Sequence, residues 1–197
     1  MRIHNEESEP FTEDTGNEKF KVFSRVLSTE YIIYLSDSVE AQSLDYSDLL
    51  NILDTVKETD VVRLKLSNFG GAVHSGLRIC HAMKNCPAIV EVQAEGPCYS
   101  MGAIIALCGD LLYMAPGSFL MFHNYSTVES GKGGEVQAAV SEYRNHFLKT
   151  FKHMCYPFLT KKEINNIDAD KDVYIHSDDA NLADRLVRHF KMIKKIK

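Results

Sequence analysis

The sequence predicts an α/β fold with a largely parallel sheet, and two observations support this prediction. Short apolar segments with the composition of β-strands alternate with longer segments whose apolar residues recur at helical spacing. Clusters of turn-forming residues follow several of the apolar segments, as expected where buried strands end. In sheets of this kind, functional residues gather in the loops beyond the carboxyl ends of the strands.

The first half of the chain supplies four of the expected strands. Residues 41–57 place leucine, isoleucine and valine on one helical face, and residues 60–66 alternate like a strand before the breaker cluster Ser67–Gly71. A helix is expected through Ile79 and Met83. The other strands are expected at 26–27, 31–35 and 89–92.

The second half continues the alternation. A short helix is expected at 101–107, and a long one at 135–154. Strands are expected at 111–114 and 119–122. No internal repeat or linker divides the chain, so we expect one domain over residues 20–197, preceded by an acidic segment 1–19 that is too polar to order itself and should be mobile.

Composition limits the classes of function. The 197 residues, 45% of them hydrophobic, can form a sizeable core, and no apolar run is long enough to span a membrane. The acidic N-terminus does not resemble a secretory signal, and five scattered cysteines without a C-x-x-C pair indicate reduced thiols in a cytoplasmic compartment. The net charge of −5 argues against nucleic-acid binding, and neither a cofactor nor a metal is expected.

The stretch Gly96–Ala103 has the clearest chemical content. A strand, a Gly-Pro turn and then Ser100 before an apolar helix would place a hydroxyl at a helix N-terminus, where free N–H groups favour a developing oxyanion. The same serine could simply cap the helix. Cys98 stands where the nucleophile elbow of α/β-hydrolases has glycine, so that motif is absent.

A serine nucleophile needs a base and an orienting acid. His123 closes the apolar strand 119–122, from which its ring could face Ser100, although a strand-end histidine can also be structural. Asp168, Asp170 and Asp172 cluster before an apolar segment, and spacing alone does not choose among them. Gly70-Gly71 could bring a backbone N–H to a reacting carbonyl or could form a plain turn.

Together these residues resemble a known family. Ser-x-x-Gly-Gly at 67–71, Gly-x-x-x-Ser-Met-Gly-Ala ending at Ala103, and Met-x-His ending at His123 are similar to ClpP, the proteolytic subunit of the Clp protease. The resemblance runs in order from about residue 20 to about residue 187. It implies the ClpP/crotonase-like spiral of repeated β-β-α units, with a protruding handle at about 124–158.

The resemblance also implies the roles of the site residues. Ser100 corresponds to the nucleophile, His123 to the general base and Asp172 to the orienting acid, because Lys171-Asp172-Val173-Tyr174 matches the family's run at that point. The N–H groups of Gly71 and Met101 correspond to the oxyanion hole. The Gly-rich segment 130–134 corresponds to the strand that pairs with extended peptide substrate.

Partners follow from the same resemblance. It implies a homo-oligomer, a heptameric ring or two stacked rings, that acts on peptides and unfolded proteins and pairs with an AAA+ unfoldase. We expect Phe147 and Phe151 on the long helix to be part of an apolar oligomer interface. Arg63 and Lys65 stand where the family has aromatic residues that receive the unfoldase's loops.

Other departures indicate a divergent, specialised or phage-encoded member, which would work in the host cytoplasm. Phe69 replaces the family's proline before the glycine pair, and Cys98 and Tyr99 replace small residues before the serine. Three functions therefore stay open: a serine endopeptidase enclosed in a ring, a ring subunit with weak or no catalysis, and, ranked last, a crotonase-type acyl-CoA enzyme on the related fold.

Overall fold

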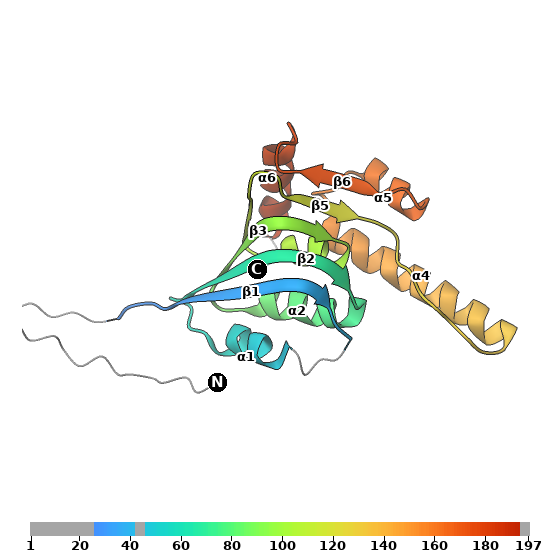
Figure 1. The fold of residues 1–197 in the computed structure, drawn as a ribbon, viewed down its shortest axis with the longest axis horizontal. Helices are drawn as coiled ribbons and strands as arrows, with labels where there is room; N and C mark the ends of the chain where they lie inside the picture. The colour runs from blue at the N-terminus through green and yellow to red at the C-terminus, as the bar shows by residue number, and fades with distance from the viewer. Residues whose placement is uncertain (1–25, 42–45, 194–197) are drawn as a thin grey trace, which may run out of the picture.

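The computed structural model describes residues 26–41 and 46–193, and Figure 1 shows their arrangement. The predicted mobile segment 1–19 lies outside the described residues. Along the chain the elements are β1 (Glu30–Val39), α1 (Ser47–Thr55), β2 (Val61–Gly71), α2 (Val73–Asn85), β3 (Ile89–Tyr99), α3 (Met101–Ala106), β4 (Leu111–Met114), β5 (Phe119–Phe122), α4 (Gly133–Cys155), α5 (Lys161–Asp168), β6 (Val173–His176) and α6 (Leu182–Ile193).

The described strands form one sheet in the order β1-β2-β3-β5-β6, with β4 also paired to β3. All neighbours are parallel except β5 and β6, which run antiparallel. Parallel neighbours need crossover connections, and helices supply most of them here. The predicted α/β spiral with a mostly parallel sheet is confirmed.

One face of the sheet is covered, and the strand sequences explain why. In β2, Val62, Leu64 and Leu66 are buried, whereas Arg63 and Lys65 between them point to the opposite face. Helices α1 and α2 lie against the covered side, and α4 extends away from the body of the molecule (Figure 1). The covered side holds the core, and no described helix covers the other face of β1–β3, here called the open face.

The open face carries a ladder of ion pairs across its strands. The Arg63 guanidinium is paired with Glu30 on β1 and, at 3.1 Å, with Glu91 on β3. The Lys65 ammonium lies 2.8 Å from Glu95 on β3 and 5.4 Å from the centre of the Tyr34 ring. Each cation that the sequence analysis singled out is therefore neutralised by the chain's own neighbouring strands.

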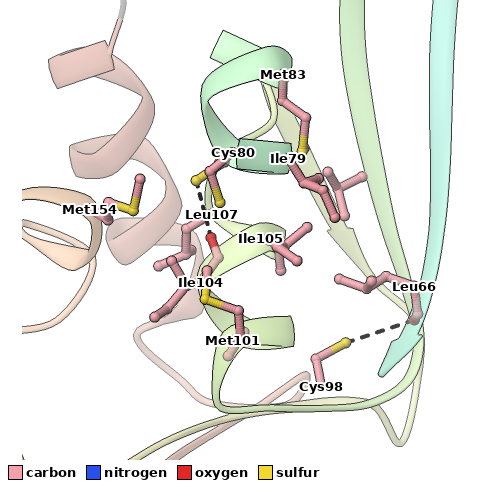
Figure 2. Close-up of a cluster of buried hydrophobic side chains, with 14 of the residues drawn as sticks. Leu66, Ile79, Cys80, Met83, Cys98, Met101, Ile104, Ile105, Leu107 and Met154 are labelled. Carbon is pink, nitrogen blue, oxygen red and sulfur yellow. Dashed lines mark hydrogen bonds between the residues drawn. The ribbon is translucent and has the colours of Figure 1, made fainter. Parts of the chain in front are cut away.

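The core around α3 contains sulfur-bearing side chains. Figure 2 shows Cys80 near Leu107 and Met101 near Ile104, with Cys98 directed at the backbone of Leu66. All five cysteines are buried. Burial raises the pKa of Cys98 to about 12, and it also raises the pKa values of the Cys80 and Cys155 thiols.

Several predicted elements were wrong at their ends. Residues 26–29 form no strand, and Val26 and Leu27 are exposed because nothing in the described chain packs on them. β2 runs through the predicted breaker cluster to Gly71, and β3 runs through the predicted Gly-Pro turn to Tyr99. In both cases pairing with the neighbouring strand continues, across a register shift that accommodates the irregular residues.

The long helix differs from its prediction in two respects. Phe147 and Phe151 are buried inside the chain, where they pack on Tyr125, Phe122 and each other, so the prediction that they are part of an exposed interface was wrong. The predicted substrate-pairing strand at 130–134 is also absent, because residues 133 and 134 begin α4 instead. Among described residues, no helix is long and apolar enough to cross a membrane.

Helices α5 and α6 are joined by a partly buried ion pair. Arg185 on α6 donates to both carboxylate oxygens of Glu163 on α5, at 3.0 and 2.8 Å, and to the carbonyl of Phe158 at 3.1 Å. Glu163 also accepts from the N–H of Thr160 at 2.7 Å, which caps α5. One carboxylate therefore serves both the helix start and the contact between the helices.

We expect acid to weaken this junction. Burial raises the pKa of Glu163, but hydrogen bonds from Arg185 and Thr160 outweigh that effect and lower it to about 2. Because folding lowers this pKa, the ionised Glu163 stabilises the folded chain at pH values above its ordinary pKa of 4.5. This stabilisation is lost as the pH falls towards 2. Solvent screens part of the interaction, so Glu163→Gln should cost about 1–2 kcal/mol of unfolding free energy at pH 7.

Denaturant unfolding of wild type and Glu163→Gln at pH 7 and pH 3 measures this contribution. The difference between the two proteins should be smaller at pH 3. Glu142→Gln, on the exposed side of α4, is the matched control and should cost nothing at either pH. An equal cost of Glu163→Gln at both pH values would contradict the assignment.

Candidate active site

Ser100 lies at the junction between β3 and α3 in a strained backbone conformation. Its φ and ψ are 53° and −118°, a positive φ that residues other than glycine rarely adopt. Its N–H donates to the carbonyl of Met121 on β5 at 2.8 Å, which fixes the junction against that strand. Strain held in this way is typical of positions where a side chain must be presented at a defined angle.

His123 follows β5 directly and is half-buried. It lines a cavity of about 60 Å³ together with Ser100, Gly71 and Met101. The four residues come from three different segments of the chain, namely the end of β2, the β3–α3 junction and the end of β5. The structure thus brings the predicted nucleophile, base and oxyanion-hole residues to one cavity.

The three acids of the predicted cluster differ in their surroundings. Asp168 is paired with the guanidinium of Arg144 at 2.7 Å, and Asp170 accepts a hydrogen bond from the side-chain amide of Asn124 at 2.8 Å. Asp172 precedes β6 and makes neither kind of contact. Val173 pairs with Phe122, and one further step in this antiparallel register would pair Asp172 with His123.

The predicted triad is not joined by hydrogen bonds in this chain. Ser100, His123 and Asp172 are all described residues, and no hydrogen bond links their side chains to one another. Asp172 is exposed, and His123 is half-buried. Catalytic hydrogen bonds are often long before substrate is bound, so the register and the shared cavity are the informative features.

The glycine pair is required by close approach to the serine. A side chain on Gly70 would lie 2.7 Å from the Cβ of Ser100 and 3.0 Å from the amide nitrogen of Met101. Gly71 has a φ of 136°, and a side chain there would lie 2.2 Å from the carbonyl oxygen of Val39. Only glycine can therefore place this backbone against the β3–α3 junction.

A second, larger cavity adjoins the first. Its volume is about 420 Å³, and it lies between α2, α3 and α4. Most of its lining is apolar, including Val73, Leu77, Met101, Ile104 and Met154. Met101 and Ile104 line both cavities, so an extended molecule at Ser100 could place an apolar side chain here. No sequence pattern indicated this cavity.

Asn68 is a residue that sequence reasoning missed. It is 1% exposed, and its side-chain oxygen accepts the N–H of Gly70 at 2.8 Å. In the sequence it belongs to a cluster of turn-forming residues, and such residues are usually exposed. Among the described residues, no group of three histidine, cysteine or acidic side chains is placed to hold a metal ion.

Comparison with known proteins identifies a family and a relative that resemble this chain. The model of the Clp protease family matches residues 14–187. Proteolytic subunit 3 of the ATP-dependent Clp protease, a chloroplastic protein of Arabidopsis thaliana, is 29% identical over 153 residues, which are 76% of this chain and 48% of that protein. The chain therefore spans about half the length of the curated relative it matches.

Proposed function

The chain belongs to the Clp protease family, and on that basis we propose that it is a serine endopeptidase with Ser100, His123 and Asp172 as its catalytic triad. One observation carries the proposal: Ser100 and His123 line one cavity with the two residues proposed to donate to the oxyanion, Gly71 and Met101. A serine that merely capped a helix would need neither its positive φ nor a histidine across a cavity.

In this proposal each residue has one role in peptide hydrolysis. The Ser100 hydroxyl attacks the scissile carbonyl, and His123 takes its proton and passes it to the leaving amine. Asp172 holds the imidazole in the required tautomer and stabilises its cationic form. The N–H groups of Gly71 and Met101 donate to the developing oxyanion, and water then releases the acyl group through the same steps.

The proposal is tested by reaction with a fluorophosphonate probe. Such probes phosphonylate activated serine hydroxyls, so mass spectrometry of the labelled protein should find the adduct on Ser100. His123→Ala should block labelling, since the hydroxyl would no longer be activated. A folded protein that stays unlabelled, or is labelled elsewhere, would overturn the assignment.

A ring subunit with weak catalysis is the second candidate, and one observation favours it. The three proposed triad side chains are not hydrogen-bonded to one another in the single chain. Assembly without labelling by the probe would support this candidate. The third candidate, a crotonase-type acyl-CoA enzyme, would keep the oxyanion donors but needs no serine-histidine pair, and binding of acyl-CoA by Ser100→Ala would support it.

The apolar cavity predicts the substrate preference. A volume of about 420 Å³ accommodates a large apolar side chain, and the described lining contains no aspartate, glutamate, lysine or arginine to pair with a charged one. We expect kcat/KM for peptides with leucine, phenylalanine or methionine before the scissile bond to exceed that for lysine or aspartate at least about tenfold.

A pair of variants locates the preference. Leu77→Phe on α2 reduces the cavity and should lower kcat/KM for phenylalanine peptides more than for alanine peptides. Val187→Phe on α6 adds the same side chain at an exposed position outside the cavity lining and should change neither. Equal hydrolysis of all peptides by the wild type would contradict the role of the cavity.

We further propose that the chain acts in the cytoplasm as a homo-oligomeric ring or double ring that encloses its active sites, with α4 as the protruding handle. α4 extends from the body of the subunit (Figure 1), and its exposed residues Val140 and Tyr143 are available for contact with other subunits. Unfolded proteins and peptides are the proposed substrates. An AAA+ unfoldase remains a candidate partner, but the charged side chains on the open sheet face affect how it could dock.

We expect conventional Clp unfoldases to dock poorly. An apolar loop reaching β2 would displace the partners of Arg63 and Lys65, and breaking these pairs would leave charged groups to be desolvated. A purified ring mixed with a bacterial Clp unfoldase, ATP and a tagged folded substrate should therefore show less than about a tenth of the degradation rate of a standard Clp protease.

Variants separate the charges from other causes. Arg63→Tyr with Lys65→Tyr should increase ATP-dependent degradation, because apolar rings would then replace the charged heads. Arg63→Lys with Lys65→Arg keeps the charges and should leave the rate low. Robust degradation by the wild-type ring would reject this prediction.

A further inference from the structure

We propose that Asn68 is the positioning residue of the oxyanion hole: its buried side-chain oxygen holds the Gly70–Gly71 backbone in the conformation that aims a donor at the reacting carbonyl. The inference rests on the proposed function of Ser100. In this proposal Asn68 does not contact the substrate. It acts through the contacts that its side chain makes within the chain.

The first support is the single hydrogen bond of a fully buried amide. The Asn68 oxygen accepts from the Gly70 N–H at 2.8 Å, and the side-chain nitrogen, also buried, has no partner among the described residues. Burying an amide with half its hydrogen-bonding capacity unused costs free energy. Leucine would fill the same volume without that cost, so the bond to Gly70 is the feature that an asparagine provides here.

The second support is the conformation of the segment that Asn68 holds. Gly70 and Gly71 have φ values of 82° and 136°, and glycine samples many alternatives to such values. The preceding residue is poorly placed to fix them, because the Phe69 side chain is 65% exposed and stacks on the Tyr99 ring, at 6.0 Å between centroids. Pairing with β1 restrains the glycine pair from one side, and the inward-pointing Asn68 adds a side-chain hydrogen bond to Gly70.

The third support is that Asn68 also packs against the serine side of the site. A Cβ on Gly102 would lie 2.9 Å from the Asn68 oxygen and 3.0 Å from its Cβ, so Asn68 fills the space beside the second residue of α3. The two proposed oxyanion donors are Gly71, three residues after Asn68, and Met101, next to Gly102. One side chain thus contacts both segments that carry the donors.

Loosening a donor should lower the rate of the chemical step and leave substrate binding unchanged. Complete removal of one oxyanion donor costs about 10²–10³ in kcat, and a donor that is present but mobile should cost less. We expect Asn68→Leu to lower kcat about ten- to a hundredfold with KM unchanged. The affinity for a peptide aldehyde, whose hemiacetal mimics the oxyanion, should fall by the same factor.

The experiment compares Asn68→Leu with two matched variants. Asn68→Asp keeps an acceptor for Gly70 and should retain most of the activity. Cys98→Ala truncates the buried residue that pairs with Asn68 on β3 and should leave kcat within about threefold, since it removes packing but not the bond. If Asn68→Leu does not fold, Asn68→Ala takes its place in the same measurements.

Hydrogen exchange of the Gly70 amide gives a readout that does not depend on activity. Exchange should accelerate in Asn68→Leu and stay slow in Asn68→Asp and Cys98→Ala. A wild type that hydrolyses no peptide would overturn the proposed function, while exchange would still decide whether Asn68 holds Gly70. Unchanged kcat and aldehyde affinity in a folded Asn68→Leu protein, or unchanged exchange, would overturn the role proposed for Asn68.

Discussion

Replacing Ser100 with alanine is expected to abolish peptide hydrolysis while leaving the fold and the assembly unchanged. The hydroxyl forms the acyl-enzyme bond, and loss of a triad nucleophile lowers kcat by at least about 10⁴-fold. The side chain is half-buried, and among the described residues it makes no hydrogen bond, so its removal should cost little stability. Initial rates on a fluorogenic peptide, together with light scattering, measure both effects.

Ser141→Ala, which removes a hydroxyl from the exposed side of α4, is the control and should keep the wild-type rate. Hydrolysis by Ser100→Ala at the wild-type rate would show that another group is the nucleophile. A change in oligomeric state would show instead that the β3–α3 junction contributes to assembly.

Replacing Asp172 with asparagine is expected to lower kcat by about 10⁴-fold, because asparagine cannot stabilise the cationic imidazole or hold its productive tautomer. The neighbouring acids supply matched controls. Asp168 is engaged by Arg144 and Asp170 by Asn124, so neither is available to His123. Asparagine at either position should lower kcat less than about tenfold.

The three variants are best compared by kcat at saturating peptide and by fluorophosphonate labelling. The Asp172→Asn protein should be labelled much more slowly than the other two. Equal losses in all three would mean that the loop before β6 acts as a structural unit. A loss confined to Asp170→Asn would transfer the acid role to that residue.

Local patterns predicted the elements around the candidate site better than those at the edges of the fold. The strands β4 and β5 have the predicted bounds because each is a short, dense apolar run between turn residues. Val26 and Leu27 form a similar run, but strand formation needs a partner, and no described strand pairs with them. Sequence patterns predict no element for α5 and β6, where a few apolar residues stand among many charged ones.

The candidate site shows the same division. Ser100 and His123 lie at the ends of strands, which the sequence indicates by a change from apolar to turn-forming residues. The structure places both at one cavity, and their catalytic roles stay predictions. Asn68 could not be found in this way, because its importance lies in burial and in a bond to Gly70. Phe147 was wrongly predicted to be part of an exposed interface, because helical periodicity identifies an apolar face but does not show which residues cover it.

The burial of all five thiols makes the chain suitable for site-specific spectroscopic labelling in its native form. Thiolates are the reactive species, and burial both hides these sulfurs and raises the pKa values of Cys80, Cys98 and Cys155. A cysteine introduced at Glu142, on the exposed side of α4, would therefore be the accessible thiol among the described residues. A fluorophore there could report the environment of α4 without removing a native cysteine.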